Sequence, residues 1–389
     1  MWYFGVILGG TESSQFDIFF SRCGDFLADF TNLMGYSFEG DPYNNAVNGL
    51  QEKIYPALPY VITKLFTSLD LSLNQSSFLA ISKQPKFMAF FIVNFMVFAV
   101  LFFSTVRNAI EGNDFIKTLF AFVVTFSSAM LFAYERANFI LVTCLCCLYY
   151  IANYNSQDKY KREISLLCLA IAFALKLSPA VLGVLLIYDK RYLDCIKVSI
   201  YGLLAFVVPF LLFEGGIENI NLMFRNMGLW FNVYSDLSGI SLKATIDSFI
   251  RLCYPSFNWT EELSLSIRIF SIIVSSLFVL TAWLHNRQFD KVLSITLVLL
   301  LAPKVAQNYC ILYFIPSIVC FFNRKKKNKY DIICFMSFLL ICWSFILPNF
   351  SCFYLQKLAF LLLLTFVLVK TIMTVCLRIK NFSFSKCGN

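Results

Sequence analysis

The chain has 389 residues, of which 59% are hydrophobic and only 14% are charged. With a mean hydropathy of +0.71, this composition lies outside the range of soluble globular domains and indicates a polytopic membrane protein. The formal net charge of +9 does not indicate nucleic-acid binding, because Lys and Arg occur in short runs between apolar segments, as they do in cytoplasmic loops.

Thiol and imidazole side chains offer little for metal binding in this chain. Most of the 14 cysteines lie inside apolar runs, where a thiol behaves as a small hydrophobic group, so no disulfide framework is implied. His285 is the single histidine. We therefore expect neither a bound metal nor another cofactor, and any acid–base chemistry must come from carboxylates, Lys or Tyr.

Apolar segments of membrane length follow one another along most of the chain. They lie at 86–106, 115–134, 138–154, 164–188, 197–213, 263–284, 291–323, 331–348 and 354–377. A short apolar start at 2–8 would be a first helix that is too brief to span a bilayer by itself. The pattern predicts an all-α bundle that forms one transmembrane domain over residues 1–389.

Two of these segments are too long for a single pass, and a lysine close to a proline interrupts each of them. The breaks lie around Lys176 in the segment 164–188 and around Lys304 in the segment 291–323. A straight helix would bury this charge in hydrocarbon, so each break predicts a tight turn between two short helices. Counted in this way, the bundle has about 11–12 transmembrane helices.

The basic loops then all fall on one side of the membrane, which is the pattern of cytoplasmic loops. The opposite side receives the first loop at 10–85, the segment 135–138, the two lysine turns and a long loop at 214–262. Within the first loop, residues 54–71 have apolar positions at helical spacing and predict an amphipathic helix along the membrane surface. Because helical bundles place their sites where loops converge, we expect an active site at this non-cytoplasmic face.

The first external loop carries a cluster of carboxylates that includes Asp17, Asp25 and Asp29. Such a cluster beside a bilayer costs desolvation energy and suffers like-charge repulsion, so it favours a chemical role for at least one member. For any single one of these residues, a solvated loop cap is the simpler interpretation.

Short motifs occur in a distinctive order along the chain and on one side of the membrane. They are Asp41-Pro42-Tyr43, Tyr55-Pro56-Ala-Leu-Pro59-Tyr60, Glu135-Arg136-Ala137-Asn138, Ala174-Leu175-Lys176-Leu177-Ser178-Pro179, and Leu301-Ala302-Pro303 leading to Tyr309. In this order they resemble the GT-C glycosyltransferases that use polyprenyl-phosphate sugars, and most closely glycosyltransferase family 87, a group of mannosyltransferase-like bacterial membrane proteins. The resemblance extends from about Asp17 to Asn323.

The resemblance implies an inverting hexosyltransferase of the cell membrane. In such an enzyme, a carboxylate of the first external loop deprotonates the acceptor hydroxyl while the lipid phosphate leaves the anomeric carbon. A positioned general base accelerates such a step by roughly 100-fold or more. Asp29 is the first candidate for this base, followed by Asp25 and Asp17, and their spacing does not separate them.

The leaving phosphate needs cations, and Arg136, Lys176 and Lys304 are expected at the same face as the carboxylates. Arg136 can equally be held in a structural ion pair with Glu135 or with an aspartate. Related chains often carry a histidine after the second proline turn, whereas this chain has Lys304 and Gln307 there. Either of these two residues is a candidate substitute for that histidine.

Polar and aromatic residues near these cations are candidates for sugar or acceptor binding. They are Glu135, Asn138, Tyr43, Asn232, Trp230, Gln307 and Tyr309. Rings next to amides suit a pyranose, because its apolar face stacks on a ring while its hydroxyls bind amides. An aromatic belt at the membrane interface would give the same local composition.

The sequence has no Gly-rich phosphate loop and no nucleotide-binding pattern, which favours a polyprenyl-phosphate-linked sugar as donor and a glycan or lipid-linked glycan as acceptor. Besides these substrates, the lipid bilayer is the expected partner. Two other functions stay open, namely a polysaccharide polymerase or ligase and a non-enzymatic transporter of lipid-linked glycans. A transporter would place its polar breaks near the bilayer midplane and would show an internal repeat, and neither feature is evident.

Overall fold

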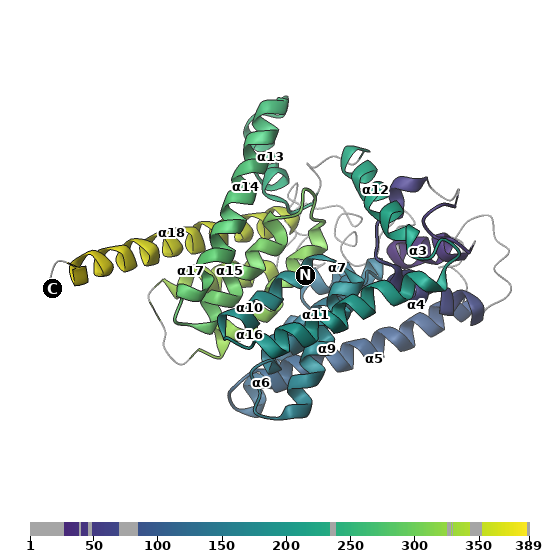
Figure 1. The fold of residues 1–389 in the computed structure, drawn as a ribbon, viewed down its shortest axis with the longest axis horizontal. Helices are drawn as coiled ribbons and strands as arrows, with labels where there is room; N and C mark the ends of the chain where they lie inside the picture. The colour runs from purple at the N-terminus through teal and green to yellow at the C-terminus, as the bar shows by residue number, and fades with distance from the viewer. Residues whose placement is uncertain are drawn as a thin grey trace, which may run out of the picture.

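The computed structural model describes residues 27–38, 40–45, 49–69, 85–233, 239–324, 328, 330–342 and 352–386. All regular elements in these ranges are helices, and no strand occurs among them (Figure 1). Asp17, Asp25 and the short apolar start at 2–8 lie outside the described residues. The predicted all-α class is confirmed.

Four helical segments among the described residues are long and apolar enough to span a membrane. They are Ala89–Ala109 within α5 (Pro85–Ala109), Tyr192–Leu212 formed by α11 (Tyr192–Val207) and η4 (Val208–Leu212), Glu261–Leu284 formed by α14 (Glu261–Thr281) and η5 (Ala282–Leu284), and Tyr354–Arg378 within α18 (Cys352–Lys386). Shorter apolar helices lie between them, among them α8 (Ile140–Asn153) and α17 (Asp331–Cys342). Together they make the chain a polytopic membrane protein.

The segment predicted as one pass at 115–134 is divided into two helices. α6 (Asp114–Thr125) and α7 (Ser128–Arg136) meet at an angle of 47°. Ser127 caps α7, because its hydroxyl accepts a hydrogen bond from the backbone N–H of Met130. The apolar composition of the segment conceals this bend, since the cap needs only one serine.

The first predicted hairpin forms where Lys176 interrupts an apolar run. α9 (Lys159–Leu175) ends before the lysine, whose backbone is extended, and the chain continues as η3 (Ser178–Gly183) and α10 (Val184–Tyr188). Pro179 stands in the first turn of η3, where its missing N–H costs nothing. At the end opposite the turn, the segments that flank the hairpin are joined by a hydrogen bond. The Tyr154 hydroxyl, just before α9, donates to the Asp189 carboxylate at 3.0 Å.

The second predicted hairpin has the same plan. α15 (Gln288–Leu301) ends before the turn at 302–307, and η6 (Asn308–Phe314) and α16 (Ile315–Phe322) return along it. At the end opposite the turn, the rings of Phe289 and Phe321 lie 5.3 Å apart. Both breaks predicted from the sequence are therefore confirmed as turns.

A smaller helical layer lies over one end of the bundle (Figure 1). It contains α3 (Ala28–Phe38), η1 (Leu50–Glu52), α4 (Ala57–Leu69) and α12 (Glu218–Val233), and α13 (Leu242–Cys253) follows α12 along the chain. Aromatic contacts join this layer to the bundle, since Tyr43 packs against Tyr60 of α4 and Phe210 of η4 at 5.2 and 5.5 Å between ring centroids. The predicted amphipathic segment 54–71 corresponds to α4.

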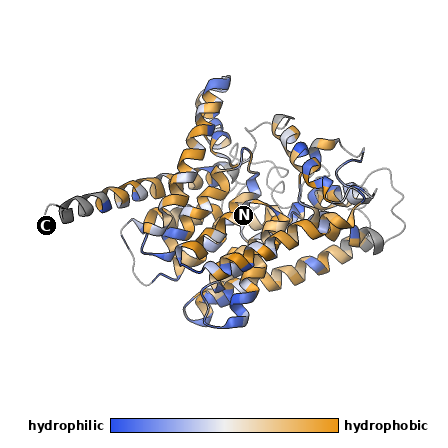
Figure 2. Cartoon of the chain, in the orientation of Figure 1, coloured by the Kyte–Doolittle hydropathy of each residue, from blue (hydrophilic) through white to orange (hydrophobic). Residues whose placement is uncertain are grey.

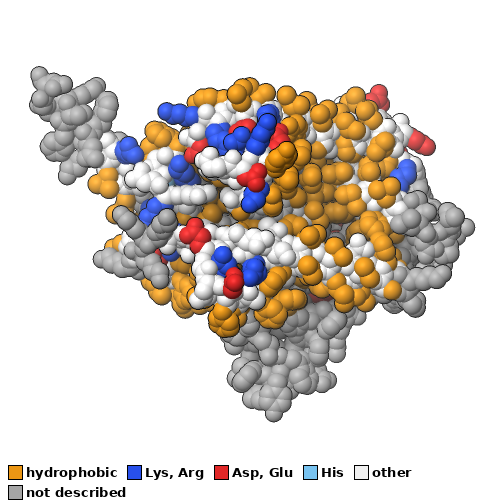
Figure 3. Space-filling model, turned by 90° about the horizontal axis from the view of Figure 1, so that it is seen from below, with side chains coloured by type: hydrophobic (Ala, Val, Ile, Leu, Met, Phe, Trp, Pro, Cys, Tyr) orange, Lys and Arg blue, Asp and Glu red, His pale blue; other side chains and the backbone are white. Residues whose placement is uncertain are grey.

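The outer surface of the bundle is apolar. Hydrophobic residues run along the helices, whereas hydrophilic residues gather at helix ends (Figure 2). Val97, Val100 and Leu101 on α5 are each more than half exposed, at 55, 63 and 53%. Viewed from below, charged side chains form patches within an otherwise largely apolar face (Figure 3). Such a surface fits contact with lipid tails.

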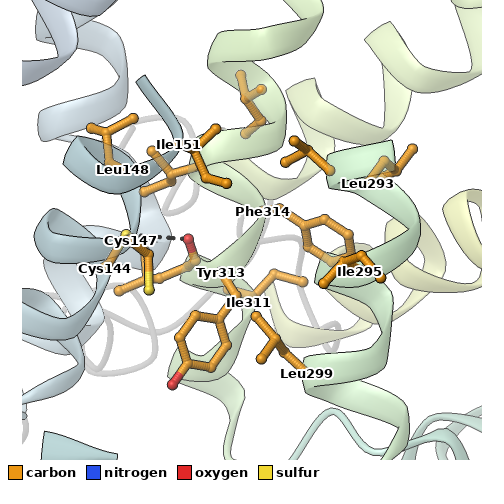
Figure 4. Packing of buried hydrophobic residues seen from close by; sticks show 14 of the residues in the cluster. Cys144, Cys147, Leu148, Ile151, Leu293, Ile295, Leu299, Ile311, Tyr313 and Phe314 are labelled. Atoms are coloured by element: carbon orange, nitrogen blue, oxygen red, sulfur yellow. Dashed lines mark hydrogen bonds between the residues drawn. The ribbon is translucent and has the colours of Figure 1, made fainter. Parts of the chain in front are cut away.

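The core of the bundle lies where α8, α15 and the returning helix of the second hairpin pack together. Figure 4 shows side chains from these elements in this cluster, with Phe314 between Leu148 on one side and Leu293 on the other. Cys144 and Cys147 are buried in the same cluster, and the Cys144 thiol donates to the Leu312 carbonyl at 3.3 Å. As expected, these free thiols pack as small apolar groups.

Replacing Phe314 with alanine tests this core. Phe314 is fully buried, so we expect Phe314→Ala to lower the free energy of unfolding by about 3 to 5 kcal/mol through lost contacts and a new cavity. Phe115→Ala is the matched control, because Phe115 is 74% exposed. Thermal unfolding of the purified chain in detergent compares the two variants. Equal shifts in melting temperature would contradict the assigned core.

Candidate active site

The position of Asp29 is set by the start of α3. Leu27 adopts a left-handed backbone conformation with φ 58°, and its N–H donates to the Glu135 carbonyl at the end of α7 at 2.8 Å. This bond holds the first turn of α3 beside the last turn of α7. Asp29 and Arg136 face each other as a result, although they are 107 residues apart in the sequence.

Asp29 accepts three hydrogen bonds in a half-buried setting where its side chain is 15% exposed. Arg136 Nη2 donates to Oδ1 at 2.7 Å and Arg136 Nε donates to Oδ2 at 3.1 Å, so the ion pair is bidentate. Asn138 Nδ2 donates to Oδ2 at 2.7 Å and lies 3.2 Å from the Tyr55 hydroxyl. The Asn138 carbonyl oxygen accepts from the N–H of Ile140, which fixes the orientation of the amide.

Lys176 is held by aromatic rings. Its ammonium lies 4.7 Å from the centre of the Tyr55 ring and 5.2 Å from that of Tyr309. Ring faces attract a cation without neutralising its charge. Among the described residues, no carboxylate forms an ion pair with Lys176. The charge on this lysine thus stays available to an anion.

Contacts with α12 and with the segment that follows it fix the turn that carries Lys304. Lys304 Nζ donates to the carbonyl of Phe231 in α12 at 2.8 Å, and the N–H of Ile240 donates to the carbonyl of Ala306 at 2.7 Å. Gly239 has φ +89°, and a Cβ at this position would stand 2.0 Å from the Ala306 oxygen. Only glycine fits here, because it allows both the backbone conformation and the close approach.

These side chains share one cavity of about 900 Å³ at the end of the bundle. Among the candidates predicted from the sequence, the structure brings the following to its walls: Asp29, Arg136, Lys176, Trp230, Lys304, Gln307 and Tyr309. A volume of this size lies within the range of small-molecule binding sites. Residues from α3, α7, α9, α12 and both hairpin turns therefore converge on one space, as the distribution of polar insertions predicted.

The remaining candidates lie differently. Glu135 and Asn138 are buried behind the wall, where Glu135 contributes its backbone carbonyl and Asn138 orients Asp29. Asn232 belongs to α12. Tyr43 is fully buried, and its hydroxyl donates to the Tyr55 carbonyl at 2.9 Å. Burial, with smaller effects of Tyr60 and Asp41, raises the pKa of the Tyr43 phenol well above its usual range, so Tyr43 acts as a neutral donor.

Arg268 of α14 was missed by the sequence reasoning, yet it lines the cavity. Its Nη1 donates to the Ala302 carbonyl at 2.7 Å, next to the Lys304 turn. The signal was present, because Arg268 is a lone charge inside the apolar segment 263–284, the same kind of exception that identified Lys176. Arg268 and Lys304 also line a smaller neighbouring cavity of about 380 Å³.

Charge in the larger cavity is predominantly positive. Arg136, Lys176, Arg268 and Lys304 line it together with two carboxylates, those of Asp29 and Glu52. The described residues contain no group of three or more His, Cys, Asp or Glu side chains that could hold a metal ion. The cavity can therefore accommodate an anion such as a phosphate beside a positioned carboxylate.

The model of glycosyltransferase family 87 matches residues 71–306, which is more than half of the chain. The matched region contains Arg136, Lys176 and Lys304, whereas Asp29 precedes it. Neither the curated proteins nor the solved structures yield a match.

Substitution of Gly239 tests how firmly the Lys304 turn is held. We expect Gly239→Ala to destabilise the chain, because a Cβ would collide with the Ala306 carbonyl and the left-handed backbone costs roughly 1–2 kcal/mol. Gly228→Ala in α12 is the matched control, since nothing lies within 4 Å of its added Cβ, and alanine stabilises a helix by about 0.5–1 kcal/mol. Opposite shifts of the thermal midpoint are expected. A Gly239→Ala variant as stable as the parent chain would refute the contact.

Proposed function

The chain belongs to glycosyltransferase family 87, and from this premise we propose that it moves a sugar from a polyprenyl-phosphate donor to a hydroxyl group of a glycan or lipid-linked acceptor. The chain is thus a membrane glycosyltransferase, and the proposal concerns its donor, acceptor, mechanism and side of action. The observation that carries it is the single cavity in which the Asp29 carboxylate faces four cationic side chains. The distribution of basic loops favours the non-cytoplasmic face of the cell membrane.

Asp29 is the proposed general base. Each carboxylate oxygen has two lone pairs, and Oδ2 uses both of its own for Arg136 and Asn138, whereas Oδ1 accepts only from Arg136. Oδ1 therefore retains a lone pair that can take a proton. Arg136 and Asn138 orient the carboxylate, so a structural ion pair and a catalytic role are compatible in the same residue.

In the proposed step, Oδ1 of Asp29 removes the proton of the acceptor hydroxyl, and the acceptor oxygen forms a bond to the anomeric carbon of the donor. The bond from that carbon to the phosphate oxygen breaks, and its electron pair stays on the phosphate. Attack from the side opposite the leaving group inverts the anomeric configuration. Lys176, Lys304 and Arg268 lie on the cavity wall, where their charges can stabilise the departing phosphate.

The general base is tested with Asp29→Asn. We expect turnover of a polyprenyl-phosphate sugar, measured as release of lipid phosphate in the presence of a glycan acceptor, to fall by roughly 100-fold or more. Asp41→Asn is the matched control, because Asp41 does not line the cavity and asparagine retains the oxygen that accepts from the Tyr43 N–H.

Preserved turnover in Asp29→Asn would leave Asp25 and Asp17 as candidates for the base. If all three aspartates can be neutralised without loss, the carboxylate mechanism is wrong. A transporter would instead move the donor across vesicle membranes without releasing lipid phosphate, which separates that function from the transferase.

The role of Lys176 in binding the leaving phosphate is tested with Lys176→Gln. Removing one preorganised group that stabilises the charge of the transition state typically lowers kcat by about 10²–10³-fold. We expect a loss in this range for Lys176→Gln. Lys64→Gln is the matched control, since Lys64 also lies over an aromatic ring, at 5.2 Å from the centre of Phe213, but does not line the cavity. Steady-state kinetics with the lipid-linked donor compare the variants. Similar kcat values for both would argue against Lys176 as a phosphate ligand.

A further inference from the structure

A second large cavity, of about 1240 Å³, lies at the opposite end of the bundle from Asp29. Two helices connect the ends. α5 begins beside the Asp29 region, where Phe91 lies 6.1 Å from Phe30, and it ends at Ala109 in the wall of the second cavity. α15 begins at Gln288 in that wall and ends at Leu301 beside the turn that carries Lys304. The glycosyltransferase proposal assigns no role to this second space.

The second cavity is strongly cationic. Lys117, Lys161, Arg287 and Arg324 line it together with one carboxylate, Glu111. Arg324 already has a partner within the protein, because it forms an ion pair with Asp331 at 2.6 Å and stacks on the ring of Phe321 at 3.7 Å. Lys117, Lys161 and Arg287 form no ion pair with any described residue. Three like charges around one space repel each other unless an anion lies between them.

The wall of this cavity on the α5 side is apolar and faces outward. Leu101 lines the cavity and is 53% exposed, and it continues the exposed apolar strip formed by Val97 and Val100. Leu148 and Val319 line the inner wall and are buried. Viewed from below, the molecule has Lys and Arg side chains close to broad apolar areas (Figure 3). A soluble anion would gain nothing from an apolar wall, whereas an anionic lipid would contact the cations with its headgroup and the apolar wall with its acyl chain.

The rim of the cavity is held in place by the protein itself. Asn323 donates to the Ala109 carbonyl at 2.6 Å and accepts from the N–H of Glu111 at 2.9 Å, so it joins the end of the second hairpin to the turn after α5. Lys117, in the first turns of α6, follows directly from this turn. The backbone that carries Lys117 is therefore anchored, and little backbone entropy has to be lost there on binding.

We propose that this cavity binds the headgroup of an anionic phospholipid, with the phosphate between Lys117, Lys161 and Arg287 and an acyl chain along Leu101 of α5. Clusters of Lys and Arg next to apolar surface recognise such headgroups through charge, and each cation near a membrane surface strengthens binding by roughly five-fold. This site is separate from the cavity that contains Asp29 and needs no catalytic residue.

The proposal is tested by binding to the purified full-length chain in neutral detergent. Short-chain phosphatidylglycerol is titrated and the thermal midpoint is recorded, with short-chain phosphatidylcholine and inorganic phosphate as parallel probes. We expect phosphatidylglycerol to raise the midpoint and the other two to leave it nearly unchanged. Equal shifts with phosphatidylcholine would overturn recognition of the negative charge, and equal shifts with inorganic phosphate would overturn recognition of a lipid.

Two matched double variants assign the effect to the cavity. Lys117→Gln with Arg287→Gln should weaken phosphatidylglycerol binding by roughly 25-fold, because two contributions of about five-fold multiply. Lys159→Gln with Arg378→Gln removes the same two charges from exposed positions outside the cavity and should leave the affinity unchanged. If both double variants bind equally well, the headgroup site does not exist. Native mass spectrometry of the retained lipid gives a second readout that does not depend on the stability of the variants.

Discussion

The cost of placing a charge in hydrocarbon determines where this protein forms the cavity that contains Asp29. Lys176 and Lys304 each interrupt an apolar run, and neither could remain inside a straight membrane helix without a partner. The chain turns at both points, so each lysine lies in the turn of a hairpin. Both turns face the same end of the bundle, and the helical layer formed by α3, η1, α4 and α12 closes over them.

The pair formed by Asp29 and Arg136 completes this arrangement. It joins the covering layer to the bundle, and the same hydrogen bonds that hold the two elements together also hold the Asp29 carboxylate in the cavity wall. In the proposed mechanism, the stabilising contact and the role of Asp29 as a base therefore depend on the same residue pair. The cations at the opposite end of the bundle differ from Arg136, because three of the four in the second cavity have no ion-pair partner among the described residues.

Much of the fold follows from the sequence because its signals are local. Long apolar runs predict α5, α11, α14 and α18, and a lysine near a proline predicts each hairpin turn, since hydrocarbon tolerates neither an unpaired charge nor a broken backbone. The bend between α6 and α7 escaped prediction, because the single serine that caps α7 hardly changes the composition of the segment. Arg268 stands out in the sequence as a lone charge in an apolar segment, but its place in the cavity depends on how α14 packs, which periodicity does not reveal.

By itself, the sequence determined the class of the protein, the places where the membrane helices turn, and a short set of acids and cations from which the site could be built. The tertiary structure decided which of these meet. It placed Asp29 against Arg136 rather than leaving it as a solvated cap, directed the Tyr43 hydroxyl to a backbone carbonyl in the core, and added Arg268 to the wall. The reason is physical: apolar periodicity depends on neighbours along one helix, whereas an ion pair depends on distances across helices that are far apart in the chain.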